Sequence, residues 1–251
     1  MKRLLPVAVL LVMAALAALP YPAAAQSDRQ RVRFAQLQYP GGIWNPNPTA
    51  ARSLMIYLSR HTSIVVSPER LDLAWDSPEL FYQPLLWITG CEAFDAFPDN
   101  AIFNLRKYVA FGGTIVFDDC TGLSGGGFDR SVRLTAERLF PRNPMMPVPH
   151  NHDIYKSFFL LEGAPGRLSV AKEIEGVQVG GRTAILYSRN DLGGAWARRS
   201  DGGFVHDQIS AGEAGRERAF RMGLNIFMYA LNVDYKSDQV HIPFILKRRR
   251  L

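Results

Sequence analysis

Cysteine, histidine and charge of one sign are all scarce in this sequence of 251 residues. It contains 2 cysteines and 5 histidines, and it lacks any tight ligand spacing, such as His-Glu-x-x-His, that predicts a metal centre. Its 29 basic residues exceed its 23 acidic residues by only six, and they are scattered except at residues 247–250. Proteins that bind nucleic acid gather their cations into a patch or stripe. We therefore expect no nucleic-acid partner, no metal and no cofactor.

Long apolar runs are also absent, since none reaches the roughly 20 residues of a membrane-spanning helix. The run over residues 4–19 follows the positive end Met1-Lys2-Arg3 and precedes a proline pair and three alanines that end at Ala25. This charged, apolar, small-residue order predicts a secretory signal that is cleaved after Ala25. Cleavage removes two cations and leaves a net charge of +4 (27 − 23). We expect a periplasmic or secreted protein, with an uncleaved N-terminal anchor as the alternative.

Short apolar runs alternate with amphipathic segments along the rest of the chain. Runs that are largely apolar and β-branched are typical of strands covered on both faces. Apolar residues at helical spacing, with start and stop signals, predict helices between them. Strands are expected over residues 31–39, 63–67, 84–89, 114–119 and 183–188, the last in a hairpin that turns at Gly180-Gly181. Helices are expected over residues 47–61, 77–79, 98–111, 129–140 and 215–231, the first starting at Asn47-Pro48.

Strands that alternate with helices require crossover connections, because each helix must cover one face of the sheet. The predicted architecture is a three-layer α/β domain with an open, mostly parallel sheet. Residues 26–231 form this single domain, and residues 232–251 form a C-terminal extension with a basic end. The apolar patch at residues 241–246 adds an edge strand or packs on the surface. The basic end is either a solvated terminus or a contact for an anionic membrane surface.

Polar residues follow the ends of several predicted strands. In open parallel sheets, ligands bind beyond the carboxyl ends of the strands, where the strand order reverses. We therefore expect a crevice at this edge that binds a ligand or partner. Its predicted lining residues are Tyr39, Trp44, Asp118, Asp119, His152, Asn190 and Asp191. Trp44 and Trp196 form either an aromatic wall for a sugar or peptide, or lids packed over the sheet edge.

Several ordered blocks also carry a family resemblance. They include the segments 34–39, 112–120 (GGTIVFDDC), 127–131, 187–193 (YSRNDLG), 223–226 and 235–241. Together they resemble the bacterial domain-of-unknown-function family DUF4159. The resemblance implies a fold similar to class I glutamine amidotransferases or flavodoxin, and it implies no established activity. Around His152 the sequence departs from the family, which tends to have Asp-His-Pro there.

Three kinds of chemistry compete for the predicted crevice. Cys120 follows a strand as the nucleophile of an amidotransferase does, with His152 as a base and Asp119 beside it, but a flanking carboxylate disfavours the thiolate. Alternatively, Cys91 and Cys120 form a disulfide, or both remain inert buried thiols. A third possibility is a metal held by Asp118, Asp119 and His152. The competing interpretation is that the two carboxylates only cap loop amides and pair with Arg130 or Arg133.

These observations favour binding over catalysis. We predict an exported domain that binds a small ligand or an envelope protein at the crevice, and we assign no catalytic residue. The alternative is a hydrolase or amidotransferase-like enzyme that acts through Cys120 or through a metal bound by Asp and His.

Overall fold

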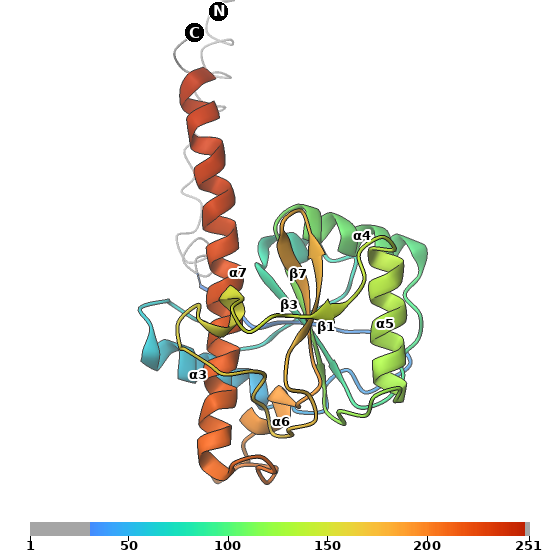
Figure 1. The fold of residues 1–251 in the computed structure, drawn as a ribbon, viewed down its shortest axis with the longest axis vertical. Coiled ribbons are helices and arrows are strands. Elements are labelled where there is room, and N and C mark those ends of the chain that lie inside the picture. Colours follow the sequence, from blue (N-terminus) through green and yellow to red (C-terminus); the bar gives the residue numbers. More distant parts are fainter. Residues whose placement is uncertain (1–30, 249–251) are drawn as a thin grey trace, which may run out of the picture.

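The computed structural model describes residues 31–248, with side chains as far as residue 232. Seven strands form one sheet in the order β2-β1-β3-β4-β7-β6-β5 (Figure 1). Five neighbouring strands run parallel, namely β2 (Leu71–Leu73), β1 (Ala35–Leu37), β3 (Leu85–Gly90), β4 (Thr114–Asp119) and β7 (Arg182–Ser188). Two antiparallel strands complete the edge, β6 (Glu175–Val179) and β5 (Met146–Pro147). The predicted mostly parallel α/β sheet is therefore confirmed, and the closer likeness to amidotransferases or flavodoxin stays a prediction.

Helices cover both faces of the sheet (Figure 1). On one face lie α3 (Ala50–His61), α6 (Leu192–Trp196) and α7 (Gly212–Arg248). On the other lie α4 (Asp99–Ala110) and α5 (Gly127–Leu139). Two short 3-10 turns, η1 (Pro78–Tyr82) and η2 (Asp153–Tyr155), connect these elements.

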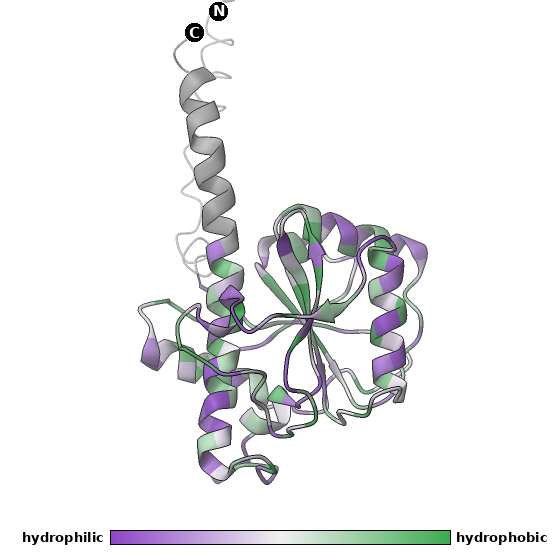
Figure 2. Cartoon of the chain, viewed as in Figure 1, coloured by the Kyte–Doolittle hydropathy of each residue, from purple (hydrophilic) through white to green (hydrophobic). Residues whose placement is uncertain are grey.

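The central strands explain the two cores. Alternate residues of a strand point to opposite faces, so Trp87 and Val116 pack with the α3, α6 and α7 side, whereas Ile88 and Phe117 pack with the α4 and α5 side. All six residues of β4 are buried. Figure 2 shows hydrophobic residues gathered in the strands, while α5 carries many hydrophilic residues. A strand that is buried on both faces needs the continuous apolar character seen in the sequence.

Three predicted elements differ from the structure. The strand expected over residues 31–39 is confined to Ala35–Leu37, and residues 63–67 contribute only a bridge between Val32 and Val66. The strand beside β1 is instead β2, whose central residue is an aspartate. The helix expected to start at Asn47 begins at Ala50, with Thr49 as its N-cap residue.

The C-terminal extension is also different. Helix α7 does not end at residue 231 but continues to Arg248, so residues 241–246 do not form the edge strand that was one of the two alternatives for them. The side chains of that segment lie outside the described residues. Within residues 31–248, no helix combines the length and the apolar composition required to cross a bilayer.

Gly223 sets how closely α7 approaches its neighbours. A Cβ atom at this position would lie 2.6 Å from the Trp196 ring and 2.7 Å from Leu54. We expect Gly223→Ala to lower the free energy of unfolding by about 1–3 kcal/mol, because an added methyl group overpacks a filled core. Urea unfolding checks this, with Arg218→Ala on the exposed side of the same helix as the control. An unchanged unfolding midpoint for Gly223→Ala would contradict this prediction, because it would show that α7 can move away from Trp196 and Leu54 without loss of stability.

Candidate functional site

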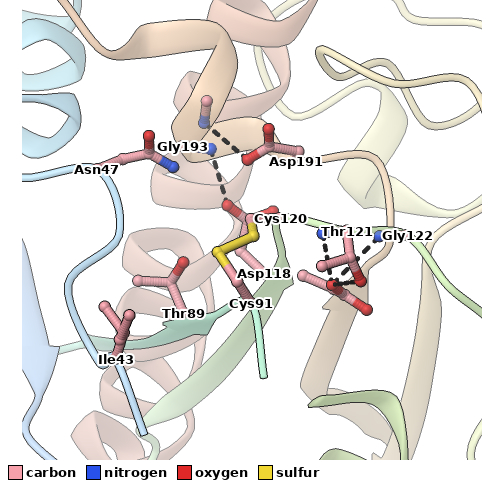
Figure 3. The surroundings of a disulfide bond; sticks show 12 residues. Ile43, Asn47, Thr89, Cys91, Asp118, Cys120, Thr121, Gly122, Asp191 and Gly193 are labelled. Atoms are coloured by element: carbon pink, nitrogen blue, oxygen red, sulfur yellow. Dashed lines mark hydrogen bonds between the residues drawn. A yellow bond between two sulfur atoms is a disulfide. The ribbon is translucent and has the colours of Figure 1, made fainter. Parts of the chain in front are cut away.

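Asp118 lies at the carboxyl edge of the sheet and binds the start of α6. Its Oδ1 accepts a hydrogen bond from the Leu192 amide at 2.9 Å, and its Oδ2 accepts one from the Gly193 amide at 2.7 Å (Figure 3). The side chain is buried, with 1% of its surface exposed. Asp118 therefore satisfies two amides that the first turn of a helix leaves without intrahelical partners. Both acceptor atoms face the protein.

Asp191 caps the same helix from the other side. It adopts a left-handed backbone (φ 54°), and its Oδ1 accepts a hydrogen bond from the Gly194 amide at 2.8 Å. Its Oδ2 forms an ion pair with Arg167. A Cβ atom on residue 194 would lie 2.0 Å from the Asp191 carboxylate, so only glycine fits there. The two aspartates and Arg167 hold α6 against the edge of the sheet.

Burial changes the acidity of this pair. Desolvation and then the charge of Asp191 raise the pKa of Asp118 to about 8, although the two amides oppose the rise. Desolvation also raises the pKa of Asp191, against the lowering effect of Arg167. Perturbed acids of this kind occur at functional sites and equally in structural networks. Here the full set of backbone hydrogen bonds favours a structural role.

Asp119 faces the opposite core and organises the loop that follows β4. Its Oδ1 accepts hydrogen bonds from the amide of Thr121 at 2.7 Å and from the amide of Gly122 at 3.2 Å. The Tyr187 hydroxyl lies 3.2 Å from its Oδ2 and 3.0 Å from the Asp129 carboxylate. Asp119 thus caps loop amides, which is one of the alternatives that the sequence left open for this residue.

The predicted ion pair with Arg130 or Arg133 does not form at Asp118 or Asp119. Arg133 instead binds Asp129 at 3.0 Å and Glu175 at 2.9 Å. Burial raises the pKa of Asp129, but hydrogen bonds from Arg133 and the Gly125 amide outweigh it and lower that pKa below its usual value. This network ties α5 to β6.

A disulfide joins Cys91 and Cys120, whose Cα atoms are 5.0 Å apart (Figure 3). It links the loops that follow the neighbouring strands β3 and β4, and the Cys120 amide donates to the Gly90 carbonyl at 3.0 Å. Of the three fates considered for these cysteines, the structure has the bridge. Neither sulfur is then a thiolate, so Cys120 is no nucleophile in this state.

Asn190 is buried and fully engaged. Its Oδ1 accepts hydrogen bonds from the amides of Val170 and Ala171, both at 2.9 Å. Its Nδ2 donates to the carbonyl groups of Ala164 at 2.5 Å and Ala171 at 2.7 Å. Every donor and acceptor of this amide side chain is used to shape the 164–171 loop, which leaves none for a ligand at the crevice.

His152 is not at this edge. Its Nε2 lies 2.9 Å from the Thr183 hydroxyl, at the start of β7, whereas Asp118 pairs with Ser188 at the other end of that strand. Its Nδ1 accepts a hydrogen bond from the Ile154 amide at 3.1 Å, and burial lowers its pKa. The predicted convergence of His152 with the aspartates is therefore wrong. The described residues also bring together no cluster of three or more His, Cys, Asp or Glu that could hold a metal ion.

The two predicted aromatic residues pack into the domain. The Tyr39 hydroxyl donates to the Thr89 carbonyl at 2.8 Å, and its ring lies 4.7 Å from that of Phe94. Trp44 is half-buried beneath the guanidinium of Arg70, 5.2 Å from the ring centroid. Trp196 lies in the core on the opposite face of the sheet, so Trp44 and Trp196 form no shared wall.

Several residues of this edge were not predicted. Arg167 and Gln208 lie in loops without periodicity, where no pattern marks a buried partner. The Thr89 Oγ1 atom is buried there without a hydrogen-bond partner among the described residues. Two surface cavities of about 610 Å³ also lie outside the aspartate cluster. One is bounded by the 160–172 loop and α7, and the other by α3, α7 and Phe204.

Comparison with known proteins gives a family and no function. A family model described as a domain of unknown function, DUF4159, matches residues 33–231. No curated protein matches the chain.

Proposed function

We propose a function from the residues of this chain, because it belongs to the DUF4159 family, whose function is unknown. It is an exported domain that binds an envelope protein at the carboxyl edge of its sheet, and it does not catalyse a reaction there. The predicted lining residues do not themselves contact the partner. They fix the loops that do.

One contrast carries this proposal. The four polar side chains Asp118, Asp119, Asn190 and Asp191 are at most 1% exposed and are hydrogen-bonded within the domain. The loops at this edge expose large apolar side chains instead: Leu123 (64%) beside the turn held by Asp119, Val170 (53%) on the loop held by Asn190, and Ile43 (56%), whose carbonyl accepts from the Tyr39 hydroxyl. We call these three residues the apolar rim. Exposed apolar groups on rigid loops suit a protein partner, since they gain free energy when they are covered.

The disulfide supports both the binding role and the export. It joins the loop after β3 to the loop that carries Leu123 (Figure 3). The loop after β3 also contacts the segment before Ile43, because the Asp95 amide donates to the Pro40 carbonyl at 3.1 Å, so the bridge helps to keep two parts of the rim in one arrangement. Preorganised loops lose less entropy on binding. Disulfides persist in oxidising compartments such as the periplasm, which agrees with the predicted signal over residues 1–25.

The enzyme alternative is less well supported. A hydrolase that uses Cys120 requires the bridge to be reduced, and His152 lies at the opposite end of β7 from Asp119. A membrane contact through residues 247–250 stays a prediction from the sequence, because those side chains lie outside the described residues.

Site-specific photo-crosslinking in the producing cell tests the proposal. We expect a photoreactive residue at position 43 or 123 to give one discrete crosslinked product with another protein. We further expect Ile43→Asp combined with Leu123→Asp to lower the yield of that product at least tenfold when the photoreactive residue is at position 170. Each charge placed in an apolar contact costs more than 1.4 kcal/mol, or one factor of ten.

Val65 provides the matched control, since it is 61% exposed and lies at the opposite edge, beside the bridge between Val32 and Val66. A photoreactive residue at position 65 and the Val65→Asp variant should leave the crosslinking pattern unchanged. Equal products from positions 43 and 65, or none from the rim, would contradict the proposal. So would a hydrolytic activity of the oxidised protein that Asp119→Asn abolishes.

A further inference from the structure

A second site is suggested by the cavity between the 160–172 loop and the first turns of α7. Its volume is about 610 Å³. The loop residues from Leu160 to Gly166 form one wall, and Gly215, Arg218 and Arg221 of α7 form the other. None of its lining residues belongs to the aspartate cluster or to the apolar rim, although Val170 of the rim lies on the same loop, between the lining residues Ser169 and Ala171.

The loop wall is held rigidly from behind. Asn190 binds the backbone at residues 164, 170 and 171 through four hydrogen bonds. The Ala164 amide also donates to the Lys172 carbonyl at 2.9 Å, which closes the loop on itself. Gly163 has a left-handed backbone (φ 79°), and a Cβ atom there would lie 2.6 Å from the Lys172 carbonyl oxygen. The wall is therefore preformed, and it does not have to fold around a ligand.

The helix wall is joined to the loop by two further contacts. The Gln208 side chain donates to the carbonyl groups of Gly166 at 2.5 Å and Ser210 at 3.2 Å. The Arg167 carbonyl accepts hydrogen bonds from the amides of Ile209 and Ser210, just before α7 begins. The two walls thus keep a fixed separation, and the space between them is not filled by a side chain.

The charges that line this cavity are mostly positive and partly unpaired. Lys172 and Arg218 are exposed, and neither side chain has an ion-pair or hydrogen-bond partner among the described residues. Arg221 is engaged with Glu217 at 3.0 Å, and His150 lies 3.2 Å from Glu173. Glu162 is the one carboxylate among the lining residues. The nearby N-terminal end of α7 adds partial positive charge.

The other cavity provides an internal comparison. It has the same volume of about 610 Å³, but its arginines are accompanied by Glu213 and Glu217. Glu213 binds Arg216 at 3.2 Å. Arg198 of that cavity is also engaged, with the Gly202 carbonyl at 2.7 Å, so Arg60 is its one cation whose side chain has no partner among the described residues. The cavity beside the 160–172 loop keeps two such cations, Lys172 and Arg218.

We propose that the cavity beside the 160–172 loop binds an anionic ligand through a phosphate or carboxylate group, with Lys172 and Arg218 as its charged contacts. Arg218 presents a fork of donors that suits either oxyanion, and Lys172 adds a point charge. Leu160 and Leu161 line the same cavity, so an apolar portion of the ligand has a surface to contact. A soluble anion and the headgroup of an anionic lipid share this chemistry.

Calorimetric titration of the full mature chain tests the proposal, with inorganic phosphate and succinate as separate soluble probes. Vesicles of phosphatidylcholine with and without phosphatidylglycerol test the lipid source in a sedimentation assay. We expect at least one anionic probe to bind, and Lys172→Gln and Arg218→Gln each to weaken that binding about tenfold, as expected for the loss of one charge-assisted hydrogen bond. Binding of the soluble probes alone identifies a soluble ligand, and binding of the anionic vesicles alone identifies a headgroup.

Arg60→Gln is the matched control, because Arg60 is exposed and lines the second cavity. It removes the same charge from the chain and should leave the affinity unchanged. Equal weakening by Arg60→Gln would show attraction to net charge alone and overturn the site. The proposal also fails if no anionic probe binds at concentrations up to about 20 mM, which is about 20 times a millimolar dissociation constant. Neither result bears on the apolar rim, whose partner is tested separately by crosslinking.

Discussion

Replacing Cys91 and Cys120 together with serine is expected to lower the free energy of unfolding by roughly 3–4 kcal/mol. The bridge closes a loop with a sequence separation of 29, and this loop length sets the chain entropy that the bridge removes from the unfolded state. Urea unfolding of the oxidised native chain and of the double variant measures the difference. Such a loss is a large part of the stability of an ordinary domain.

Reductant supplies the control for this prediction. It should move the unfolding midpoint of the native chain to that of the Cys91→Ser, Cys120→Ser variant, and it should not move the variant itself. Thiol titration of envelope-derived chain in denaturant without reductant is expected to find no free thiol, and the intact mass should be that of residues 26–251. Two titratable thiols in each chain would remove the bridge, and with it this argument for export.

The fold was predictable from the sequence wherever a residue pattern is compatible with only one kind of secondary structure. The apolar run at β4 is buried on both faces, and a strand of that kind requires parallel neighbours and helices on each side. The hairpin at Gly180-Gly181 was equally clear, because both glycines adopt positive φ (58° and 81°) that other residues disfavour. The residue pattern of these segments is therefore enough to predict their secondary structure, whichever neighbouring elements pack against them.

Edge elements and long-range placement were not predictable in this way. β2 is the three-residue segment Leu-Asp-Leu, which is too short for its alternation of apolar and polar residues to indicate a strand, and it has no continuous apolar run. The placement of His152 beside Thr183 depends on how a loop without periodicity crosses the domain. A lone histidine therefore could not be assigned to either end of the sheet from its sequence position.

The candidate site shows the same division. The rule for parallel sheets correctly brought Asp118, Asp119, Asn190 and Asp191 to one edge, but it does not say whether polar groups face solvent or backbone. Each of them turns inward because the amides of α6 and of nearby loops would otherwise be buried without partners. Loop geometry decides that outcome, and it is absent from strand and helix periodicity.

Asp118→Ala is expected to lower the free energy of unfolding by about 3–5 kcal/mol. The substitution leaves the buried amides of Leu192 and Gly193 without an acceptor, and each unsatisfied amide costs about 1–3 kcal/mol. Asp118→Asn keeps one acceptor oxygen and should cost about half as much. Urea unfolding monitored by far-ultraviolet circular dichroism measures both, and the asparagine variant keeps the comparison possible if the alanine variant fails to fold.

The effect of Asp118→Asn should depend on pH in a defined direction. Burial raises the pKa of Asp118 to about 8 in the folded chain from 3.8 in the unfolded chain. The stability contributed by its protonated form is therefore complete below about pH 4 and is lost as the pH rises toward 8, by about 1.4 kcal/mol for each pH unit at most. Asparagine has no such titration, so the penalty of Asp118→Asn should be smaller at pH 8 than at pH 5.

Asp191→Asn separates the two causes of this shift. Its carboxylate is the second contributor to the raised pKa of Asp118, after desolvation, so its removal should move the loss of stability to lower pH. The variant also loses the ion pair with Arg167, which lowers its overall stability without reversing the slope. A penalty for Asp118→Asn that grows between pH 5 and pH 8 would mean that the two amides outweigh burial and that Asp118 is ionised in the folded domain. The carboxylate would then be a fixed negative charge beneath the loops of the apolar rim, and the rim would favour a cationic partner.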